Sequence, residues 1–281
     1  MTDTQRPLRV LVTNDDGVAS PGIVALAVAL HDAGHDVRVV APASDLSGAG
    51  ASIGPLHRGG AIPVAERTWP ELPGVSVRAI ERPPATAVYL ACLGAFGERP
   101  DVVASGINPG ANTGHLVLHS GTVGAALTAA GLGVPALAVS LRWSEDGAYR
   151  WDTAAALAVP ALEWVIAGDE PRVLNLNVPN LPLTEMRGVR EATLAPYGEF
   201  WVASADLRDG DLRMEFTGKT DDFDPATDEA LLNEGYATVT PLLGIVAAPL
   251  KGAGPAVDNA WRRRRQTDSR QRSATKPKSL S

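Results

Sequence analysis

Two adjacent carboxylates, Asp15 and Asp16, follow directly on the aliphatic run at residues 8–13. Two like charges at the end of a buried strand repel each other, so they need a nearby positive charge to stay ionised. Asp is also common in turns and at helix N-caps, and one of the two could serve that way. A pair at a strand end, followed by Gly17, favours a metal site instead.

Three later segments place oxygen-bearing groups where we expect further loops at the same edge of a sheet. They are the stretches "SDLSGAGAS", "SGINPGANTG" and "HSGT". In an open α/β sheet, ligands bind beyond the carboxyl ends of the strands, so these groups should meet the two aspartates. Hydroxyl, amide and carboxylate oxygens suit Mg²⁺ or Mn²⁺ better than zinc or copper. The candidate residues are Ser47, Asn108, Asn112, Ser120, Gly121 and Thr122.

The turn at residues 120–122 is also suited to binding an anion, because N–H groups at a helix start point toward such a ligand. If the substrate is anionic, an acidic protein needs local positive charge from a metal ion or a helix N-terminus to accept it. A bound metal ion would activate a water for in-line attack, and Asp15 or Asp16 could accept the proton. We expect attack by water rather than an aspartyl-phosphate intermediate.

The segments that must position these residues alternate between strand and helix. Aliphatic runs predict parallel strands covered on both faces, and segments with one apolar face predict helices. Pro21 fits the first turn of the first helix, Gly34 fits its end, and Pro160 is expected to kink a later one. The alternation predicts a doubly wound, Rossmann-like α/β core over residues 1–182. The strands are expected at 8–13, 36–42, 100–106, 135–141 and 172–179, and later helices within 119–133 and 152–168.

The alternation of predicted strands and helices ends after Leu181. Residues 183–250 read as a β-rich extension, with a hairpin turn at Asp209-Gly210 and a strand at 234–242 that could rejoin the sheet. Residues 251–281 are basic and Ser-rich, and they are expected to be a disordered tail. A weak contact of this tail with RNA, a membrane or an acidic partner is a lesser alternative.

Composition narrows the class of protein. The chain has 281 residues and a net charge of −7, but eight Lys or Arg and one acid lie from Trp261 onward, which leaves 17 basic and 31 acidic residues in the rest. Such an acidic body is an improbable general binder of nucleic acid. Cys92 is the only cysteine, so an intrachain disulfide is excluded and a cytoplasmic setting is expected. The start lacks the pattern of a signal peptide, and no apolar run approaches the roughly 18 residues of a membrane span.

Several motifs together resemble one known family. "TNDDGVASPGIVAL", "VVAPASDLSGAGAS", "DVVASGINPGANTG" and "HSGTVGAAL" occur in the order, and at roughly the spacing, of the SurE family of survival-protein nucleotidases. The later segments "NLNVPNLP" and "EGYATVTPL" are also similar to that family, so the resemblance covers about residues 8–245. A lone Asp-Asp pair would be unspecific, whereas this combination of motifs is highly specific.

The resemblance implies a metal-dependent phosphatase of nucleoside 5′- and 3′-monophosphates, often with short polyphosphate as another substrate. It implies one divalent ion per subunit, Mg²⁺ or Mn²⁺, and an extension that is exchanged between subunits of a homodimer or homotetramer. The implied metal ligands are Asp15, Asp16, Ser47 and Asn108. The implied phosphate or substrate contacts are Asn14, Asn112, Ser120, Gly121 and Thr122. His119 is a further candidate for a substrate contact, not from the resemblance but because it directly precedes the Ser-Gly-Thr turn.

The chain also departs from the family's pattern. Most relatives carry an Asp pair where this chain has Gly114-His115-Leu116, and often a Tyr at the position of His119. A Thr-Pro-x-Asp-Cys-type segment is replaced by residues 83–87, and the usually Arg-rich loop reads Ser44-Asp45-Leu46. Because the metal ligands are retained, these changes bear on substrate choice and turnover more than on metal binding.

Two other functions are compatible with parts of the sequence. "HDAGHDVRVVAP" also resembles the N-terminal half of glycosyltransferases that bind nucleotide sugars, but the chain after residue 180 is too short for their second α/β domain. A non-catalytic nucleotide- or metal-binding relative is the other alternative, suggested by the altered pocket positions. Metal-stimulated release of phosphate separates the phosphatase from both.

Overall fold

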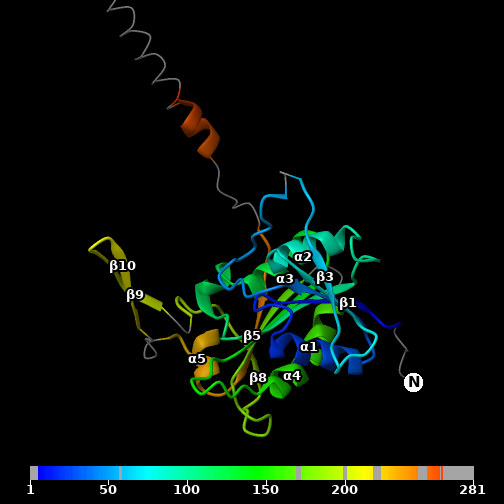
Figure 1. The fold of residues 1–281 in the computed structure, drawn as a ribbon. Helices are drawn as coiled ribbons and strands as arrows, with labels where there is room; N and C mark the ends of the chain where they lie inside the picture. Colours follow the sequence, from blue (N-terminus) through cyan, green and yellow to red (C-terminus); the bar gives the residue numbers. More distant parts are fainter. Residues whose placement is uncertain are drawn as a thin grey trace, which may run out of the picture. The chain divides into compact units, whose positions relative to one another are not determined.

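The computed structural model describes residues 6–56, 59–168, 172–198, 201–217, 223–245, 252–259 and 261. A nine-stranded sheet forms the centre of the fold, in the order β3-β4-β2-β1-β5-β6-β7-β11-β8 (Figure 1). The pairs β3–β4 and β7–β11 are antiparallel, and the others are parallel. The strands are β1 (Arg9–Thr13), β2 (Asp36–Pro42), β3 (Val64–Arg67), β4 (Ser76–Ile80), β5 (Val102–Pro109), β6 (Ala136–Leu141), β7 (Val173–Val178), β8 (Val189–Glu191) and β11 (Ala237–Leu242).

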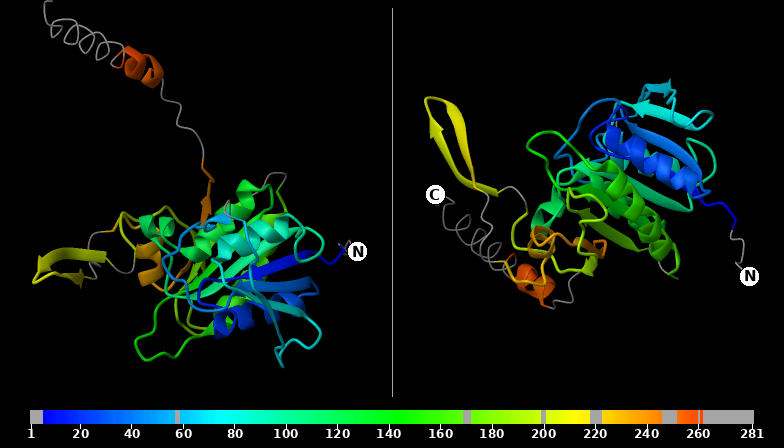
Figure 2. Two further views of the ribbon diagram at one scale, coloured as in Figure 1. Left: turned by 45° about the horizontal axis from the view of Figure 1, so that its top comes forward. Right: turned by 90° about the horizontal axis from the view of Figure 1, so that it is seen from below.

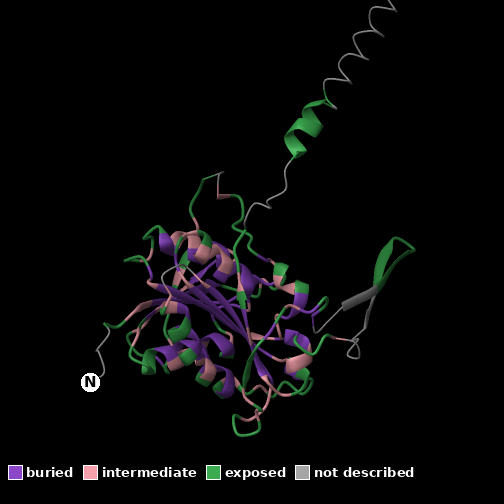
Figure 3. Cartoon of the chain, turned by 180° about the vertical axis from the view of Figure 1, so that it is seen from behind, coloured by how far each residue is buried: buried purple, intermediate pink, exposed green. Residues whose placement is uncertain are grey.

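Helices cover both faces of this sheet. The core on one face includes residues of α1 (Pro21–Asp32) and α4 (Trp151–Ile166), and the core on the other includes residues of α2 (Pro84–Cys92) and α3 (Gly121–Gly131). Successive strand residues point to opposite faces, so Val10 and Val12 join the first core and Leu11 joins the second. The strands in the middle of the sheet are accordingly buried (Figure 3). The predicted doubly wound α/β core is confirmed.

Strands β3 and β4 and helix α2 were not predicted from the sequence. Their residues lie in a stretch with many Pro, Gly and Arg residues, where no long aliphatic run marks a strand. Helix α2 begins with Pro84, and two successive prolines look like a loop even though Pro is well suited to the first helical turn. Strand β5 also runs further than expected, to Pro109, with an irregular register between Ser105 and Asn108.

The extension after residue 182 is rich in β-structure, as expected. Strands β9 (Trp201–Arg208) and β10 (Asp211–Thr217) form an antiparallel two-stranded sheet (Figure 2). Asp209 and Gly210 connect them with φ of 54° and 87°, which are the values that a type I′ hairpin turn requires. Strand β11 does rejoin the main sheet, beside β7. The short helix α5 (Asp228–Asn233) was not foreseen.

The chain divides into two units, residues 1–244 and residues 245–281. In the second of these units, residues 253–259 are helical, and no helix was expected there. Pro255 lies in the first turn of this helix, where a missing N–H costs no hydrogen bond. The prediction for the other tail residues lies outside the described part of the chain. No helix among the described residues is long and apolar enough to cross a membrane.

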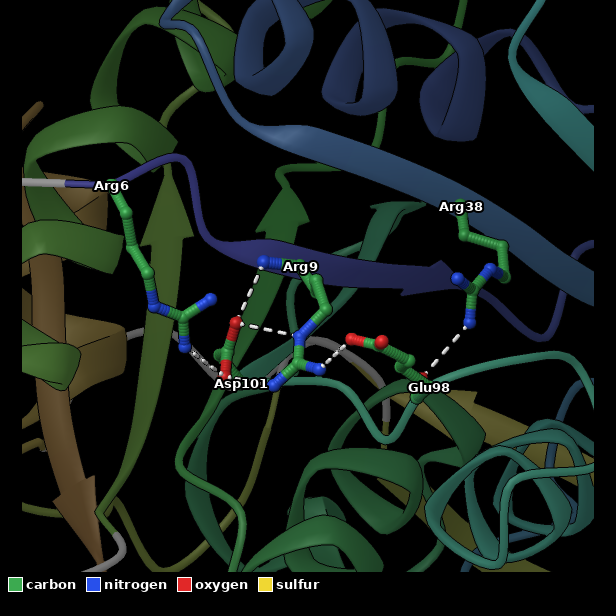
Figure 4. Close-up of polar contacts among 5 residues, drawn as sticks. All are labelled: Arg6, Arg9, Arg38, Glu98 and Asp101. Carbon is green, nitrogen blue, oxygen red and sulfur yellow. Dashed lines mark hydrogen bonds and ion pairs between the residues drawn. The ribbon is translucent and has the colours of Figure 1, made fainter.

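A group of ion pairs joins the chain segments that lead into β1 and β5. Asp101 accepts hydrogen bonds from the backbone N–H of Arg9 at 2.9 Å, from its side chain at 2.7 and 3.0 Å, and from Arg6 at 2.9 Å (Figure 4). Arg9 also pairs with Glu98, whose carbonyl accepts a hydrogen bond from Arg38 at 3.1 Å. These donors hold the pKa of Asp101 well below its usual range. The network lies at the amino ends of the strands, opposite the predicted site.

Candidate metal and phosphate site

Asp15 lies at the centre of the predicted site, two residues after the end of β1 at Thr13. Its side chain is buried, and its two oxygens accept hydrogen bonds from the start of α3. The hydroxyl of Thr122 donates to Oδ1 at 2.5 Å, and the N–H of Gly121 donates to Oδ2 at 3.1 Å. Burial raises the pKa of Asp15, and these hydrogen bonds oppose the rise because they stabilise the carboxylate. The carboxylate is therefore held in one orientation.

Thr122 also connects Asp15 with Asn108 on β5. Its hydroxyl lies 3.4 Å from Oδ1 of Asn108, and the amide nitrogen of Asn108 donates to the carbonyl of Gly110 at 2.7 Å. That second hydrogen bond fixes the amide so that its oxygen, which can bind a cation, faces Thr122. Parallel pairing of β1 with β5 places these two strand ends side by side.

Asp16 and Asn14 each have a buried oxygen that lacks a hydrogen-bond partner among the described residues. These atoms are Oδ2 of Asp16 and Oδ1 of Asn14. Burial, followed by the charges of Asp15 and Asp45, raises the pKa of Asp16 to about 7. Buried oxygens without a donor are costly, and a hard cation would satisfy them. The unpaired oxygens and the oxygen-rich set of side chains thus fit a divalent metal ion.

Ser47 comes from the loop after β2, which is tied to Asp15. The N–H of Leu46 donates to the carbonyl of Asp15 at 2.8 Å, and Gly17, with φ of 99°, packs against the backbone of Ser44. Ser47 itself is exposed, and both its N–H and its hydroxyl donate to Oδ1 of Asp45, at 2.7 and 2.6 Å. The loop therefore brings Ser47 to the same edge of the sheet as the aspartates.

Asp45 is a residue of this site that sequence reasoning did not select. Its charge contributes to the raised pKa of both Asp15 and Asp16, and it orients the hydroxyl of Ser47. The signal that could have revealed it is local: an Asp two residues before a Ser commonly accepts hydrogen bonds from it in a turn.

The predicted phosphate contacts have different roles in the structure. Ser120 caps α3, accepting a hydrogen bond from the N–H of Val123 at 3.1 Å. The N–H of Gly121 is engaged by Asp15, so in this structure Gly121 positions a carboxylate. Asn112 belongs to a separate hydrogen-bonded group, in which its backbone N–H donates to Asn177 and its side chain donates to Ser140, both at 2.8 Å.

The two histidines of this region are both exposed. His115 lies in the 3-10 helix η2 (Gly114–Leu118) and His119 follows it. The backbone carbonyl of His119 accepts a hydrogen bond from Gly50 at 3.1 Å. Within the described part of the chain, no three His, Cys, Asp or Glu side chains are grouped to hold one metal ion. A metal centre here must therefore use hydroxyl or amide oxygens as well as the aspartates.

Helix α5 of the extension supports the loop that follows Asn112. Asp228 is fully buried and accepts hydrogen bonds from the N–H groups of Gly114 and Ala195, both at 2.9 Å. Glu229 accepts one from the hydroxyl of Thr113 at 2.6 Å and pairs with Arg142 at 2.8 Å. The contacts of Thr113 and Gly114 with α5 were not predicted, because these partners lie more than a hundred residues apart and follow no local pattern.

Comparisons with known proteins agree with one another. The family model described as survival protein SurE matches residues 10–198. The 5′/3′-nucleotidases SurE of Escherichia coli O1:K1 / APEC and of Shigella boydii serotype 18 are each 40% identical to this chain over 243 residues, or 84% of this chain and 90% of each relative. The crystal structure of the SurE protein from Aquifex aeolicus matches with a TM-score of 0.68 and 29% identity, over 85% of this chain and 94% of that one.

Proposed function

The chain belongs to the SurE family of survival proteins, and on that premise we propose that it is a metal-dependent phosphatase of nucleoside 5′- and 3′-monophosphates. Relatives named 5′/3′-nucleotidases, similar over most of the chain, support this reaction class. The family assignment also disfavours the glycosyltransferase alternative. One Mg²⁺ or Mn²⁺ ion per subunit is part of the proposal, with Asp15, Asp16, Ser47 and Asn108 as its ligands.

The observation that carries the proposal is the contact of Thr122 with both Asp15 and Asn108. Three segments, the ends of β1 and β5 and the start of α3, thereby present oxygen atoms to one point at the carboxyl edge of the sheet. Beside this point lies Asp16, whose Oδ2 has no partner among the described residues. A carboxylate left unpaired next to another carboxylate is what a cation site requires.

The two aspartates of the site would have different roles in the hydrolysis. When bound, the ion would neutralise phosphoryl oxygens and favour ionisation of a water. Asp16 would accept the proton of the attacking water, because its oxygens have spare lone pairs. Asp15 is held by Gly121 and Thr122 and would serve mainly to keep the site in place.

The substrate's phosphate would lie at the start of α3. The hydroxyl of Ser120, with the N-terminal end of the helix, would stabilise charge on the non-bridging oxygens, while the hydroxyl of Thr122 keeps its hydrogen bond to Asp15. Asn14 would contribute an amide group beside Asp15 and Asp16, and Asn112 would shape the loop on the far side. His119, which is exposed and directly precedes Ser120, would reach an outer part of the substrate.

We further propose a homodimer or homotetramer in the cytoplasm. The hairpin of β9 and β10 supports the assembly, because Leu207 and Leu212 are directly opposite in the register and both are largely exposed. Exposed apolar side chains on one face of a hairpin favour contact with another protein surface.

A panel of phosphate monoesters tests the function directly. Phosphate release should be measured from nucleoside 5′- and 3′-monophosphates with EDTA, Mg²⁺ or Mn²⁺, for the natural chain and for Asp15→Asn. Asp36→Asn, at the exposed start of β2, is the control. We expect metal-stimulated release that Asp15→Asn abolishes and Asp36→Asn retains. Absence of release from every substrate would refute the phosphatase, and metal-dependent nucleotide binding without turnover would favour the non-catalytic alternative.

A further inference from the structure

A second hollow lies beyond the carboxyl ends of β2 and β4. These strands pair in parallel, with Pro42 opposite Ile80, and the N–H of Ala43 donates to the carbonyl of Ile80 at 2.8 Å. The chain then diverges on each side, which leaves a pocket of about 690 Å³. This volume falls in the range of roughly 300–1,000 Å³ that is common for small-molecule sites. Its lining residues are Ala43, Ser44, Leu46, Gly54, Pro55, Ile80, Glu81, Arg82 and Pro83.

The pocket and the proposed metal site share one wall. Residues 44–47 line the pocket through Ser44 and Leu46 and carry Ser47, a proposed ligand, while Leu46 is hydrogen-bonded to Asp15. A substrate whose phosphate lies at the aspartates could therefore extend past this loop into the pocket. Ligands of open α/β sheets bind in crevices of this kind, outside the strand ends.

The chemistry of the lining favours a planar, uncharged group. Leu46, Pro55, Ile80 and Pro83 make the walls largely apolar. Arg82 is the only basic side chain among the lining residues, and a guanidinium stacks well on an aromatic ring. Its Nε is buried and has no hydrogen-bond partner among the described residues. Glu81 is exposed at the same pocket and would repel a second phosphate.

We propose that this pocket binds the nucleoside part of the substrate and that Arg82 contacts the base. The proposal rests on the nucleotidase function proposed above, which it extends by assigning a specificity-determining residue. One end of Arg82 is already fixed, because its terminal nitrogen donates to the carbonyl of Glu81 at 2.7 Å. The stem passes Gly54, where an added Cβ would lie 3.8 Å from Cδ of Arg82. A side chain held in this way is prepared to stack on a ring.

Two substrates that differ only in the base provide the test. Adenosine 5′-monophosphate and ribose 5-phosphate should be compared as substrates in the presence of Mn²⁺, using the natural chain and Arg82→Ala. We expect Arg82→Ala to raise KM for the nucleotide by about tenfold, which lies between the effects of an exposed and a desolvated cation–π contact, without changing kcat. Hydrolysis of ribose 5-phosphate should be unchanged, which also shows that the variant is folded.

Arg67→Ala is the matched control. Arg67 has a similar local setting, because it also follows a Glu and donates to the carbonyl of that residue, at 3.1 Å. It lies away from the pocket, however. The pocket is lined by Ile80, which is paired with Val64 at the start of β3, whereas Arg67 ends β3 and is paired with Val77. Arg67→Ala should affect neither substrate. Equal loss of both substrates in Arg82→Ala, or an equal effect of Arg67→Ala, would overturn the proposal.

Binding of adenosine to the metal-free protein separates this proposal from the phosphatase itself. Adenosine carries no phosphate, so its titration by calorimetry in EDTA does not depend on turnover. We expect measurable binding that weakens about tenfold in Arg82→Ala and persists in Arg67→Ala. Absence of adenosine binding to the natural chain would refute the pocket, even if phosphate release is normal. Adenosine binding without phosphate release from any ester would support the pocket and refute the phosphatase.

Discussion

A Cβ atom at Gly121 would lie 2.6 Å from Oδ2 of Asp15. The carboxylate thus fills the space that any side chain at residue 121 would need, and it accepts a hydrogen bond from the N–H of the same residue. Gly121 is therefore required by the close approach of Asp15. The glycine and the carboxylate, 106 residues apart in the sequence, form one unit of the site.

Gly121→Ala should destabilise the protein and reduce its activity. The added methyl group must displace a buried carboxylate, and we expect a loss of about 1–3 kcal/mol in the free energy of unfolding. Gly131→Ala is the control on the same helix, because a Cβ there meets nothing within 4 Å. That change should be neutral or stabilise by about 0.5–1 kcal/mol. Urea unfolding measures both, and equal effects would contradict the explanation.

Thr122→Val should lower metal-stimulated phosphate release while leaving the fold intact. Valine keeps the shape of threonine but cannot donate to Asp15 at 2.5 Å, so the carboxylate loses one of the two hydrogen bonds that orient it. We expect a decrease in kcat of about tenfold or more. Thr128→Val is the control, since Thr128 donates only to the carbonyl of Gly124 in the same helix. Activity that is the same in both variants would argue against this role of Thr122.

The stability of the metal-free protein should fall as the pH rises toward neutrality. The pKa of Asp16 is raised to about 7 in the folded chain, whereas an unfolded Asp titrates near 4. Between these values the folded state binds more protons than the unfolded state, so a rise in pH favours unfolding. Unfolding in EDTA at pH 5 and 7 should show the loss, and Asp16→Asn should reduce it. Stability that does not change with pH, or changes equally in the variant, would show that Asp16 is not responsible.

Asp101→Asn should destabilise the fold far from the proposed site. It weakens a carboxylate that receives hydrogen bonds from Arg6 and Arg9, at an expected cost of about 1–3 kcal/mol. Because the pKa of Asp101 is lowered in the folded chain, its contribution is present above pH 4 and is lost as the pH falls through the folded pKa. Thermal unfolding at pH 7 and at pH 3 measures this.

Asp206→Asn is the control for that pair of measurements. Asp206 pairs with Arg208 in the hairpin, and both side chains are mostly exposed, so this ion pair should contribute little. Similar changes in the melting temperature for the two variants would indicate that the network at the amino ends of β1 and β5 has no special role.

Asp228→Ala should destabilise residues 112–114 together with helix α5. It leaves the buried N–H groups of Gly114 and Ala195 without an acceptor, and we expect a loss of about 2–4 kcal/mol. Glu234→Ala removes an exposed ion pair with Arg187 and should change stability little. Hydrogen exchange of the Gly114 amide reads out the local effect, and continued protection of that amide would contradict it.

Much of the fold could be predicted from the sequence because its strands are buried on both faces. Continuous aliphatic runs such as those around Val10 and Val139 are typical of parallel strands in the middle of a sheet. Pro21 and Gly34 mark the start and the end of the first helix. The prediction failed for α2 and for strands β3 and β4. These elements are short, and the prolines and arginines in and around them break the aliphatic pattern that would indicate a strand or a helix. The helix at residues 253–259 was also not predicted, because the basic, Ser-rich composition of the surrounding segment gives no helical signal.

The sequence by itself determined which chemical groups stand at the strand ends: the Asp pair, Asn108 and the Ser-Gly-Thr turn, and with them the family. Only the tertiary structure decided how these groups are used. In the structure, the N–H of Gly121 donates to Asp15, and Thr122 lies in contact with both Asp15 and Asn108. Oδ2 of Asp16 has no hydrogen-bond partner among the described residues. The physical reason is that hydrogen bonds are directional and short. Partners about a hundred residues apart are fixed by strand register and helix packing, which local sequence does not specify.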